Sequence, residues 1–203
     1  MKKLIVLLFS FLCIAVSSNA YAEKFDARKD YNCDLVSNGV WTFEGFRASD
    51  GAYLSMIFGH APIKEISKYG VEAHYLPDGD QEAHPFITRM ADDMMASPAT
   101  QGRKFDSVLT WTAPYSCGVE IKGFARIMGN IKGESTGKKV KASLLQGGKV
   151  LWSGDVAGGQ GDTEFSAKAS VKKDEKIRFQ VACAGDTAGD VTVFNVVVDT
   201  DKN

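Results

Sequence analysis

The sequence has few basic clusters, and beyond its first 22 residues it has no long hydrophobic run; each absence narrows what the protein can do. None of the later apolar runs approaches the roughly 20 residues that a membrane-spanning helix needs. Lys138-Lys139 and Lys172-Lys173 are isolated pairs of the kind found at turns and strand ends, and acidic residues number 25 against 24 basic ones. Nucleic acid is therefore not an expected partner.

Several motifs of common catalytic sites are absent too. The sequence contains no H-E-x-x-H, no phosphate-binding loop and no C-x-x-C. Asp92-Asp93 is the only acidic doublet of segment 59–103, and adjacent carboxylates tend to point apart rather than forming a glycosidase pair. Cys33 is flanked by Asn32 and Asp34, which are not the electropositive surroundings of a thiolate nucleophile. We expect no catalytic residues and no cofactor.

What the sequence does have is an export signal. Met1-Lys2-Lys3 is followed by the apolar run Leu4 to Val16, and Ala20-Tyr21-Ala22 fits the small-residue cleavage rule. This pattern predicts a cleaved signal peptide over 1–22 and a single mature domain over 23–203 in the periplasm or outside the cell. An uncleaved anchor is the alternative. Loss of the two leader lysines changes the net charge from −1 to −3.

Three cysteines remain after cleavage, which permits one disulfide in an oxidising compartment. Cys117 and Cys183 share the inward parity of their predicted strands, one at a strand start and the other at a strand end. If those strands are antiparallel neighbours, the two cysteines meet, and we predict a Cys117–Cys183 disulfide. The rival pairings are Cys33–Cys117 and Cys33–Cys183.

The C-terminal half has the period-two alternation of half-buried β-strands. Further strands are expected over 108–112, 140–144, 150–152 and 191–198, with a hairpin turn at 146–149. Strands at this spacing predict an all-β, two-sheet antiparallel sandwich. The expected inward set is Val119, Ile121, Ala125, Ile127, Phe165, Ala167, Val171, Ile177, Phe179 and Val181.

The N-terminal half is less regular. Two strands are predicted over 40–46 and 52–58, followed by a loop-rich insertion over about 59–103. Within this insertion a short helix is predicted over 86–96, with Met90 and Met94 on one face. Trp41, Trp111 and Trp152 stand in strand contexts and are expected in the core.

Several of these features resemble those of galactose-binding-like and carbohydrate-binding jelly-roll modules of secreted bacterial proteins. The matching features are the segment Asn38 to Phe43, Ser97-Pro98, the strand Val108 to Pro114 with Gly118 and Gly123, Leu151-Trp152, the stretch Val171 to Val181, and Asp190 with Thr192. The likeness extends from about residue 32 to residue 198. It departs from the family pattern at Cys117 and over 59–103.

The resemblance implies a jelly-roll fold and a non-catalytic module that binds carbohydrate. Such motifs specify a fold rather than an activity, so two other functions stay open. One is a structural or protein-interaction subunit of a periplasmic or surface assembly. The other is a glycan-active hydrolase or lyase. The expected partner is a glycan or a surface or periplasmic protein.

Candidate ligand-binding residues are aromatic side chains that can stack on sugar rings and their charged neighbours. Phe124 stands on the polar parity of its strand between Lys122 and Arg126, so it is a candidate stacking platform unless segment 59–103 covers it. Tyr53, Tyr75 and Tyr115 are candidates for a loop-tip site.

Metal binding has only weak support in the sequence. Asp78, Asp80 and Glu82 lie near His60, His74 and His84, but their spacing matches no standard metal motif. We expect a solvated polar loop there and no metal.

Overall fold

The computed structural model describes residues 22–31, 39–59, 72–76, 85–90, 93–98, 105–128, 139–184 and 191–201. They form one short helix and fourteen strands: β1 (Lys24–Asp26), α1 (Ala27–Asp30), β2 (Trp41–Arg47), β3 (Ala52–Ser55), β4 (Ile57–Gly59), β5 (Ala73–Tyr75), β6 (Phe86–Met90), β7 (Asp93–Ser97), β8 (Phe105–Thr112), β9 (Cys117–Ile127), β10 (Lys139–Gln146), β11 (Lys149–Ala157), β12 (Thr163–Val171), β13 (Lys176–Cys183) and β14 (Thr192–Thr200).

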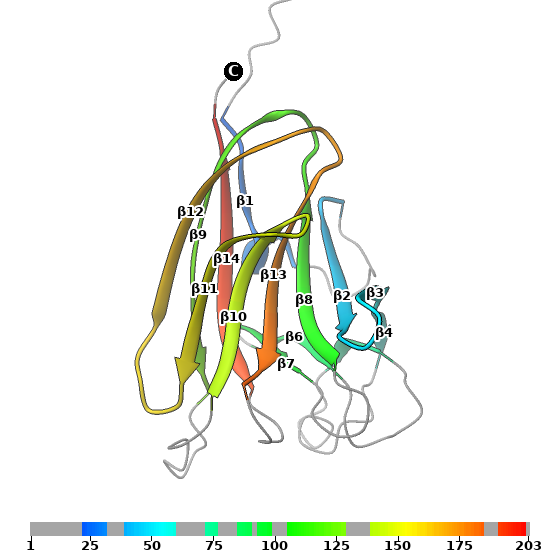
Figure 1. Ribbon diagram of the computed structural model, residues 1–203, viewed down its shortest axis with the longest axis vertical. Helices are drawn as coiled ribbons and strands as arrows, with labels where there is room; N and C mark the ends of the chain where they lie inside the picture. The colour runs from blue at the N-terminus through cyan, green and yellow to red at the C-terminus, as the bar shows by residue number, and fades with distance from the viewer. Residues whose placement is uncertain are drawn as a thin grey trace, which may run out of the picture.

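The strands build two antiparallel sheets that pack face to face (Figure 1). Sheet A has the order β12-β9-β14-β7-β6-β5-β4, with β1 also paired to β14, and sheet B has the order β11-β10-β13-β8-β2-β3. From β8 onward the chain crosses between the sheets at every connection except the β10–β11 hairpin. This arrangement is a β-sandwich of the jelly-roll type, as the strand pattern predicts.

The core lies between the sheets and contains the predicted inward set. Nine of its ten side chains are buried, and Ala167 is half-buried. Trp41 and Trp111 are fully buried, whereas Trp152 is half-buried and lies against Phe165, with their ring centroids 5.1 Å apart. Period-two alternation is therefore a sound guide here, because each of these strands has one face on the core and one on solvent.

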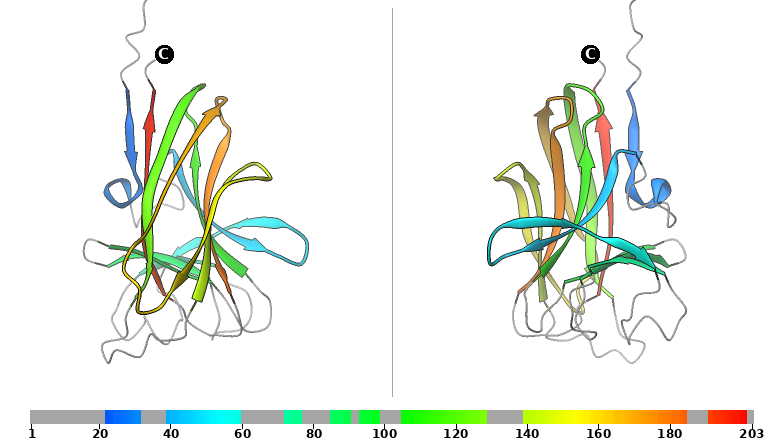
Figure 2. Two further views of the ribbon diagram at one scale, coloured as in Figure 1. Left: turned by 60° about the vertical axis from the view of Figure 1, so that its left-hand side comes forward. Right: turned by 90° about the vertical axis from the view of Figure 1, so that its right-hand side faces the viewer.

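Segment 59–103 differs from its expectation. Its described residues lie mostly in strands, and the helix predicted over 86–96 is wrong, because β6 and β7 form an antiparallel pair there. These short strands extend sheet A at a steep angle to β14 (Figure 2). The four-residue spacing of Met90 and Met94 suggested a helical face, yet Phe86, Ile87 and Thr88 are all buried in succession. Burial on both faces removes the alternation by which a strand is recognised.

The predicted mature N-terminus is tied to sheet A. β1 starts immediately after Glu23 and pairs with the C-terminal half of β14. The backbone N–H of Thr200 donates to the Glu23 carbonyl at 2.9 Å, and the Glu23 N–H donates to the Thr200 hydroxyl at 2.9 Å.

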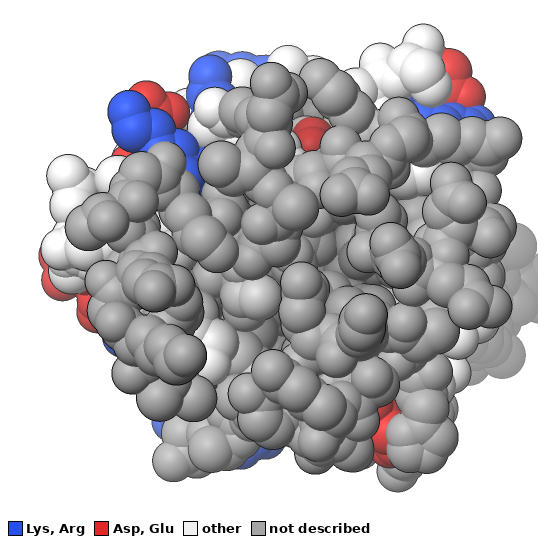
Figure 3. Space-filling model, turned by 90° about the horizontal axis from the view of Figure 1, so that it is seen from below, with Lys and Arg blue, Asp and Glu red and all other residues white. Residues whose placement is uncertain are grey.

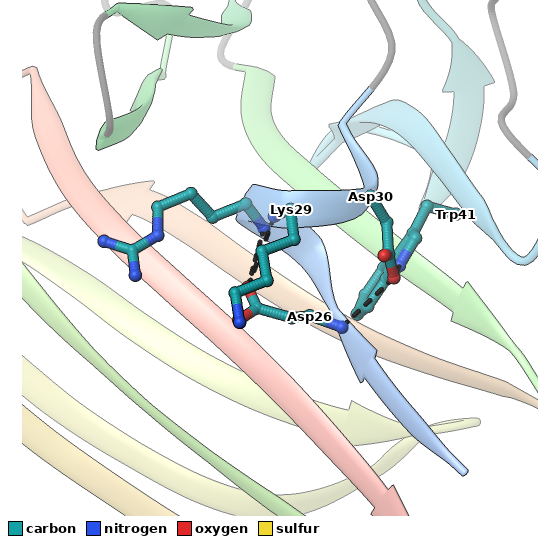
Figure 4. A network of polar contacts seen from close by, with 5 residues as sticks. Asp26, Lys29, Asp30 and Trp41 are labelled. Atoms are coloured by element: carbon teal, nitrogen blue, oxygen red, sulfur yellow. Dashed lines mark hydrogen bonds and ion pairs between the residues drawn. The ribbon is translucent and has the colours of Figure 1, made fainter.

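Helix α1 then connects this edge of sheet A to sheet B (Figure 4). Asp26 caps the helix, since its Oδ1 accepts the N–H groups of Arg28 and Lys29 at 3.2 and 3.4 Å. Oδ2 of Asp30 accepts both the Asp26 N–H at 3.1 Å and the indole N–H of Trp41 at 3.0 Å. The N-terminal segment is thus held to both layers.

The predicted Cys117–Cys183 disulfide is not formed: the two cysteines stand in different sheets and near opposite ends of them. Cys117 starts β9, opposite Val171 of β12, and lies near the beginning of β13, whose Lys176 pairs with Thr112. Cys183 ends β13, about 20 Å further along at strand spacing. The prediction required β9 and β13 to be neighbours, whereas β9 lies between β12 and β14. Cys33, and with it both rival pairings, lies outside the described residues.

Charge on the described surface is mixed. Seen from below, Lys and Arg side chains alternate with Asp and Glu side chains around the margin of the molecule (Figure 3). Among the described residues no helix is long and apolar enough to cross a membrane. The predicted signal peptide lies almost wholly outside the described residues.

Candidate functional site

The sequence-predicted site residues do not converge on one place. Lys122, Phe124 and Arg126 share the outer face of β9 in sheet A, and the three tyrosines are scattered. Tyr53 lies on β3 in sheet B, Tyr75 on β5 in the extension of sheet A, and Tyr115 in the turn between β8 and β9.

Phe124 is half-buried rather than openly exposed. The Arg126 guanidinium lies over its ring, 5.4 Å from the centroid. Arg126 is itself held by Asp93 of β7 at 3.1 Å and by Asp162 at 3.0 Å. Lys122 pairs with Glu120 at 2.7 Å. Phe124 is therefore a half-buried ring that lies beside a paired arginine, not an open platform.

Tyr115 and Tyr75 have structural surroundings. The Tyr115 hydroxyl lies 3.2 Å from Oε2 of Glu23 and 3.1 Å from the hydroxyl of Thr200, so it reinforces the junction of β1 with β14. Tyr75 packs against a small second cluster formed by Ala73 and Phe86.

The metal candidates stay untested. Asp78, Asp80 and Glu82, like His60 and His84, lie outside the described residues. His74 is fully buried and stacks on Phe43, with their ring centroids 4.0 Å apart. Within the described part of the chain no group of three His, Cys, Asp or Glu residues could hold a metal ion.

Tyr53 belongs to a much more organised arrangement, on the outer face of sheet B. The Arg178 guanidinium of β13 lies 3.9 Å from the centroid of the Tyr53 ring, and Phe46 of β2 packs at 4.9 Å with a tilt of 45°. β3 and β13 are separated by β8 and β2, a span of about 14 Å at normal strand spacing. The Tyr53 and Arg178 side chains therefore lie along the sheet and meet above the strands between them.

Glu44 of β2 is the anchor of this arrangement. It points away from the core, in alternation with Phe43 and Gly45, yet only 9% of its side chain is exposed. Its carboxylate accepts the Thr110 hydroxyl at 2.7 Å, the Lys176 ammonium at 3.2 Å and the Arg178 Nε–H at 3.2 Å. The Arg178 guanidinium is therefore held by two contacts, one to the Glu44 carboxylate and one to the Tyr53 ring.

Electrostatics support a tightly built site. Burial would raise the pKa of Glu44, but the Thr110 hydrogen bond and the charges of Lys176 and Arg178 outweigh it and hold that pKa below its ordinary value. Burial raises the pKa of Asp106, against the lowering effect of a 2.6 Å hydrogen bond from Gln180.

The pKa of Tyr53 is affected by both carboxyl groups. Burial raises the pKa of its phenol, and the negative charges of Glu44 and Asp106 raise it further, against the opposing charge of Arg178. Val108, opposite Glu44 and Gln180 in the ladder, is fully buried although it lies outside the main core. The long side chains of this face cover it.

We call this group the Tyr53 cluster; it comprises Glu44, Phe46, Tyr53, Asp106, Thr110, Lys176, Arg178 and Gln180. It combines a partly exposed aromatic ring, buried compensated charge and polar groups at its margin. Perturbed titratable groups gathered on one surface occur at functional sites and also in structural ion-pair networks.

Sequence reasoning found only Tyr53 of this cluster. One signal was available: Phe46 stands on the outward parity of β2, as Phe124 does on β9. The partners of Glu44 come from β8 and β13, more than 60 positions away, and no local pattern indicates that β8 lies beside β2 and β13 beside β8.

Comparison with known proteins gives structural neighbours only. No family model matches the sequence, and no curated protein matches it. Among solved structures, the tandem CBM51 modules of a family 98 glycoside hydrolase from Streptococcus pneumoniae align over 84% of this chain and 50% of theirs, with 13% identity and a TM-score of 0.43.

Two other matches are carbohydrate-binding modules as well. The CBM22-1–CBM22-2 tandem of Paenibacillus barcinonensis Xyn10C covers 93% of this chain and 47% of its own, with 10% identity and a TM-score of 0.42. A CBM4 structure aligns over 79% of this chain and 86% of its own, with 12% identity and a TM-score of 0.38. The chain thus spans about half of each tandem structure.

Proposed function

We propose that the protein is an exported, non-catalytic carbohydrate-binding module and that the Tyr53 cluster is its sugar-binding surface. The observation that carries this proposal is the Tyr53 ring, partly exposed and held in place by Arg178 at 3.9 Å. An aromatic ring stacks on the apolar face of a pyranose, and a ring fixed before binding loses little side-chain freedom.

Polar side chains of the Tyr53 cluster lie on the same face of sheet B as the ring. Gln180 and Asp106 are hydrogen-bonded to each other and half-buried, and the Lys176 side chain is 41% exposed. A few placed polar groups beside an aromatic surface are typical of ligand sites.

The same contacts argue for binding without catalysis. Glycoside hydrolysis commonly needs two carboxyl groups, one of them available as nucleophile or base. The Glu44 carboxylate is already engaged by three donors, so Asp106 has no second carboxyl group in the cluster available to act with it. The predicted signal peptide supports export.

The test is glycan-array screening of the mature protein, followed by affinity electrophoresis in the best polysaccharide. We expect Tyr53→Ala to weaken retention by about tenfold or more, equivalent to about 1.4 kcal/mol. Tyr53→Phe keeps the ring and is expected to retain binding.

Phe124→Ala is the matched control, since it removes the other sequence-predicted aromatic from the opposite sheet. Loss of binding in Phe124→Ala but not in Tyr53→Ala would move the site to sheet A. Absence of any glycan ligand, or turnover of the bound glycan, would overturn the proposal.

A further inference from the structure

A cavity of about 590 Å³ lies on the side of the sandwich where both sheets end. β11 is the outermost strand of sheet B and β12 the outermost strand of sheet A, and both contribute to the cavity wall together with the start of β9. We call it the edge cavity. It shares no lining residue with the Tyr53 cluster.

The wall of the edge cavity is fixed by hydrogen bonds. Gln146, at the tip of the β10–β11 hairpin, donates through Nε2 to the Ser170 carbonyl and to Oε1 of Glu175, both at 2.8 Å. Oε2 of Glu175 accepts the Lys172 N–H at 2.8 Å. The hairpin tip is thereby held to the edge of β12, so the cavity exists before any ligand arrives.

Two ammonium groups border the cavity without an ion-pair partner among the described residues. Lys149 and Lys168 are both exposed. Glu120 stands directly opposite Lys168 in the ladder; its ion pair is with Lys122, at 2.7 Å, and the charge of Lys168 is a further, smaller cause that lowers the pKa of Glu120. Both lysines are therefore available to an anionic group.

Carboxylate acceptors line the same cavity. The Asp201 carboxylate lies over Gly118, and a Cβ atom at position 118 would collide with it. The Asp201 N–H donates to the Gly118 carbonyl at 2.9 Å, which holds the residue there. Leu151 of β11, half-buried, adds an apolar side chain to the lining.

We propose that the edge cavity binds a sugar unit that carries a carboxylate. The two lysines pair with the carboxylate, ring hydroxyls donate to Asp201 and Glu120, and the C–H face of the ring rests on Leu151. Only the ligand class rests on the proposed function, because the Tyr53 cluster is a separate site.

The experiment is an amide chemical-shift titration of the mature protein with methyl glucuronide, its neutral counterpart methyl glucoside, and acetate. We expect the glucuronide to shift the amides of Gly118, Lys149 and Ser170, and the other two to leave them unchanged. The double variant Lys149→Gln/Lys168→Gln is expected to bind about tenfold more weakly, since it removes both charge partners.

Lys139→Gln/Lys141→Gln, which changes two exposed lysines of β10 away from the cavity, is the matched control and is expected to bind normally. Equal shifts by glucoside or acetate, shifts elsewhere only, or unchanged affinity in Lys149→Gln/Lys168→Gln would each overturn the proposal. Tyr53→Ala is expected to keep glucuronide binding at the cavity, which separates a failure of this inference from a failure of the proposed function.

Discussion

The indole N–H of Trp41 donates to Oδ2 of Asp30 at 3.0 Å and joins the N-terminal segment to sheet B. Trp41 is only 2% exposed, so Asp30→Ala leaves a buried donor without its acceptor. We expect a loss of about 1–3 kcal/mol in unfolding free energy. Urea denaturation of the mature protein measures it.

Asp30→Asn is the control, because its side-chain oxygen can still accept the indole N–H. It is expected to lie closer to wild type than Asp30→Ala does. Equal losses in the two variants would show that the charge of Asp30, rather than this hydrogen bond, stabilises the segment.

A second prediction concerns Glu44→Gln, which removes the charge of the carboxylate that pairs with Arg178, a side chain only 14% exposed. We expect the free energy of unfolding to fall by about 3 kcal/mol near neutral pH. This is the low end of the range for a broken buried ion pair, because the Lys176 side chain is 41% exposed and its pair with Glu44 is screened by solvent. The pKa of Glu44 is lowered in the folded state, so its stabilisation is present above its ordinary value of 4.5. It is lost as the pH falls through the lower folded value.

The difference between wild type and Glu44→Gln should therefore shrink in acid, which pH-dependent denaturation can follow. Glu120→Gln removes a surface carboxylate paired with Lys122 and is expected to change stability little at any pH. A difference for Glu44→Gln that stays constant from neutral pH into acid would contradict the electrostatic account.

Asp106→Asn should raise the stability of the folded protein at neutral pH, whereas Glu44→Gln lowers it. Burial raises the pKa of Asp106, so its ionisation costs stability that grows as the pH rises from its ordinary value of 3.8 through the higher folded value. Asparagine keeps an oxygen for Gln180 and carries no charge. We expect a higher melting temperature than wild type at neutral pH and no difference in acid.

Asp155→Asn, at an exposed position of the same sheet, is the control and should leave the melting temperature unchanged. Destabilisation by Asp106→Asn at neutral pH would mean that the ionised carboxylate of Asp106 is favourable in the folded protein.

The register of β9 gives a fourth prediction. Ile121 is fully buried, so Ile121→Asp places an unpaired charge in the core and should unfold the domain. Lys122→Asp, one position along on the exposed face, should leave the protein folded. Circular dichroism melts distinguish the two, and a wild-type melt for Ile121→Asp would show that the register is wrong.

The strands from 105 onward were predictable because one face of most of them meets solvent, and alternation then marks the register. β6 and β7 were not, since Ile87, Thr88 and Met94 are buried in strands that lack alternation. The Cys117–Cys183 error has the same origin. Parity shows which face a residue occupies, but it carries no information on which strands are neighbours.

The Tyr53 cluster was predictable only in part, because parity does not show which strands are neighbours. An outward aromatic such as Tyr53 can be identified from a pattern. Whether it belongs to a binding site depends on which side chains of other strands contact it. In the sequence, Arg178 and Thr110 have no feature that distinguishes them from other outward residues. They contact Glu44 only because β13, β8 and β2 are consecutive in sheet B, so the hydrogen bonds of Glu44 depend on that strand order.

Strand order also determines when sheet A can be completed during synthesis. β14 lies between β9 on one side and β7 with β1 on the other, so it alone joins the two halves of sheet A. A growing chain reaches β14 last among the strands described, and until then β1, made first, has no partner to pair with. Such long-range pairing makes assembly slow and leaves apolar strands unshielded while synthesis proceeds. Every strand of sheet B precedes β14, so the described part of sheet A is the layer that is completed last.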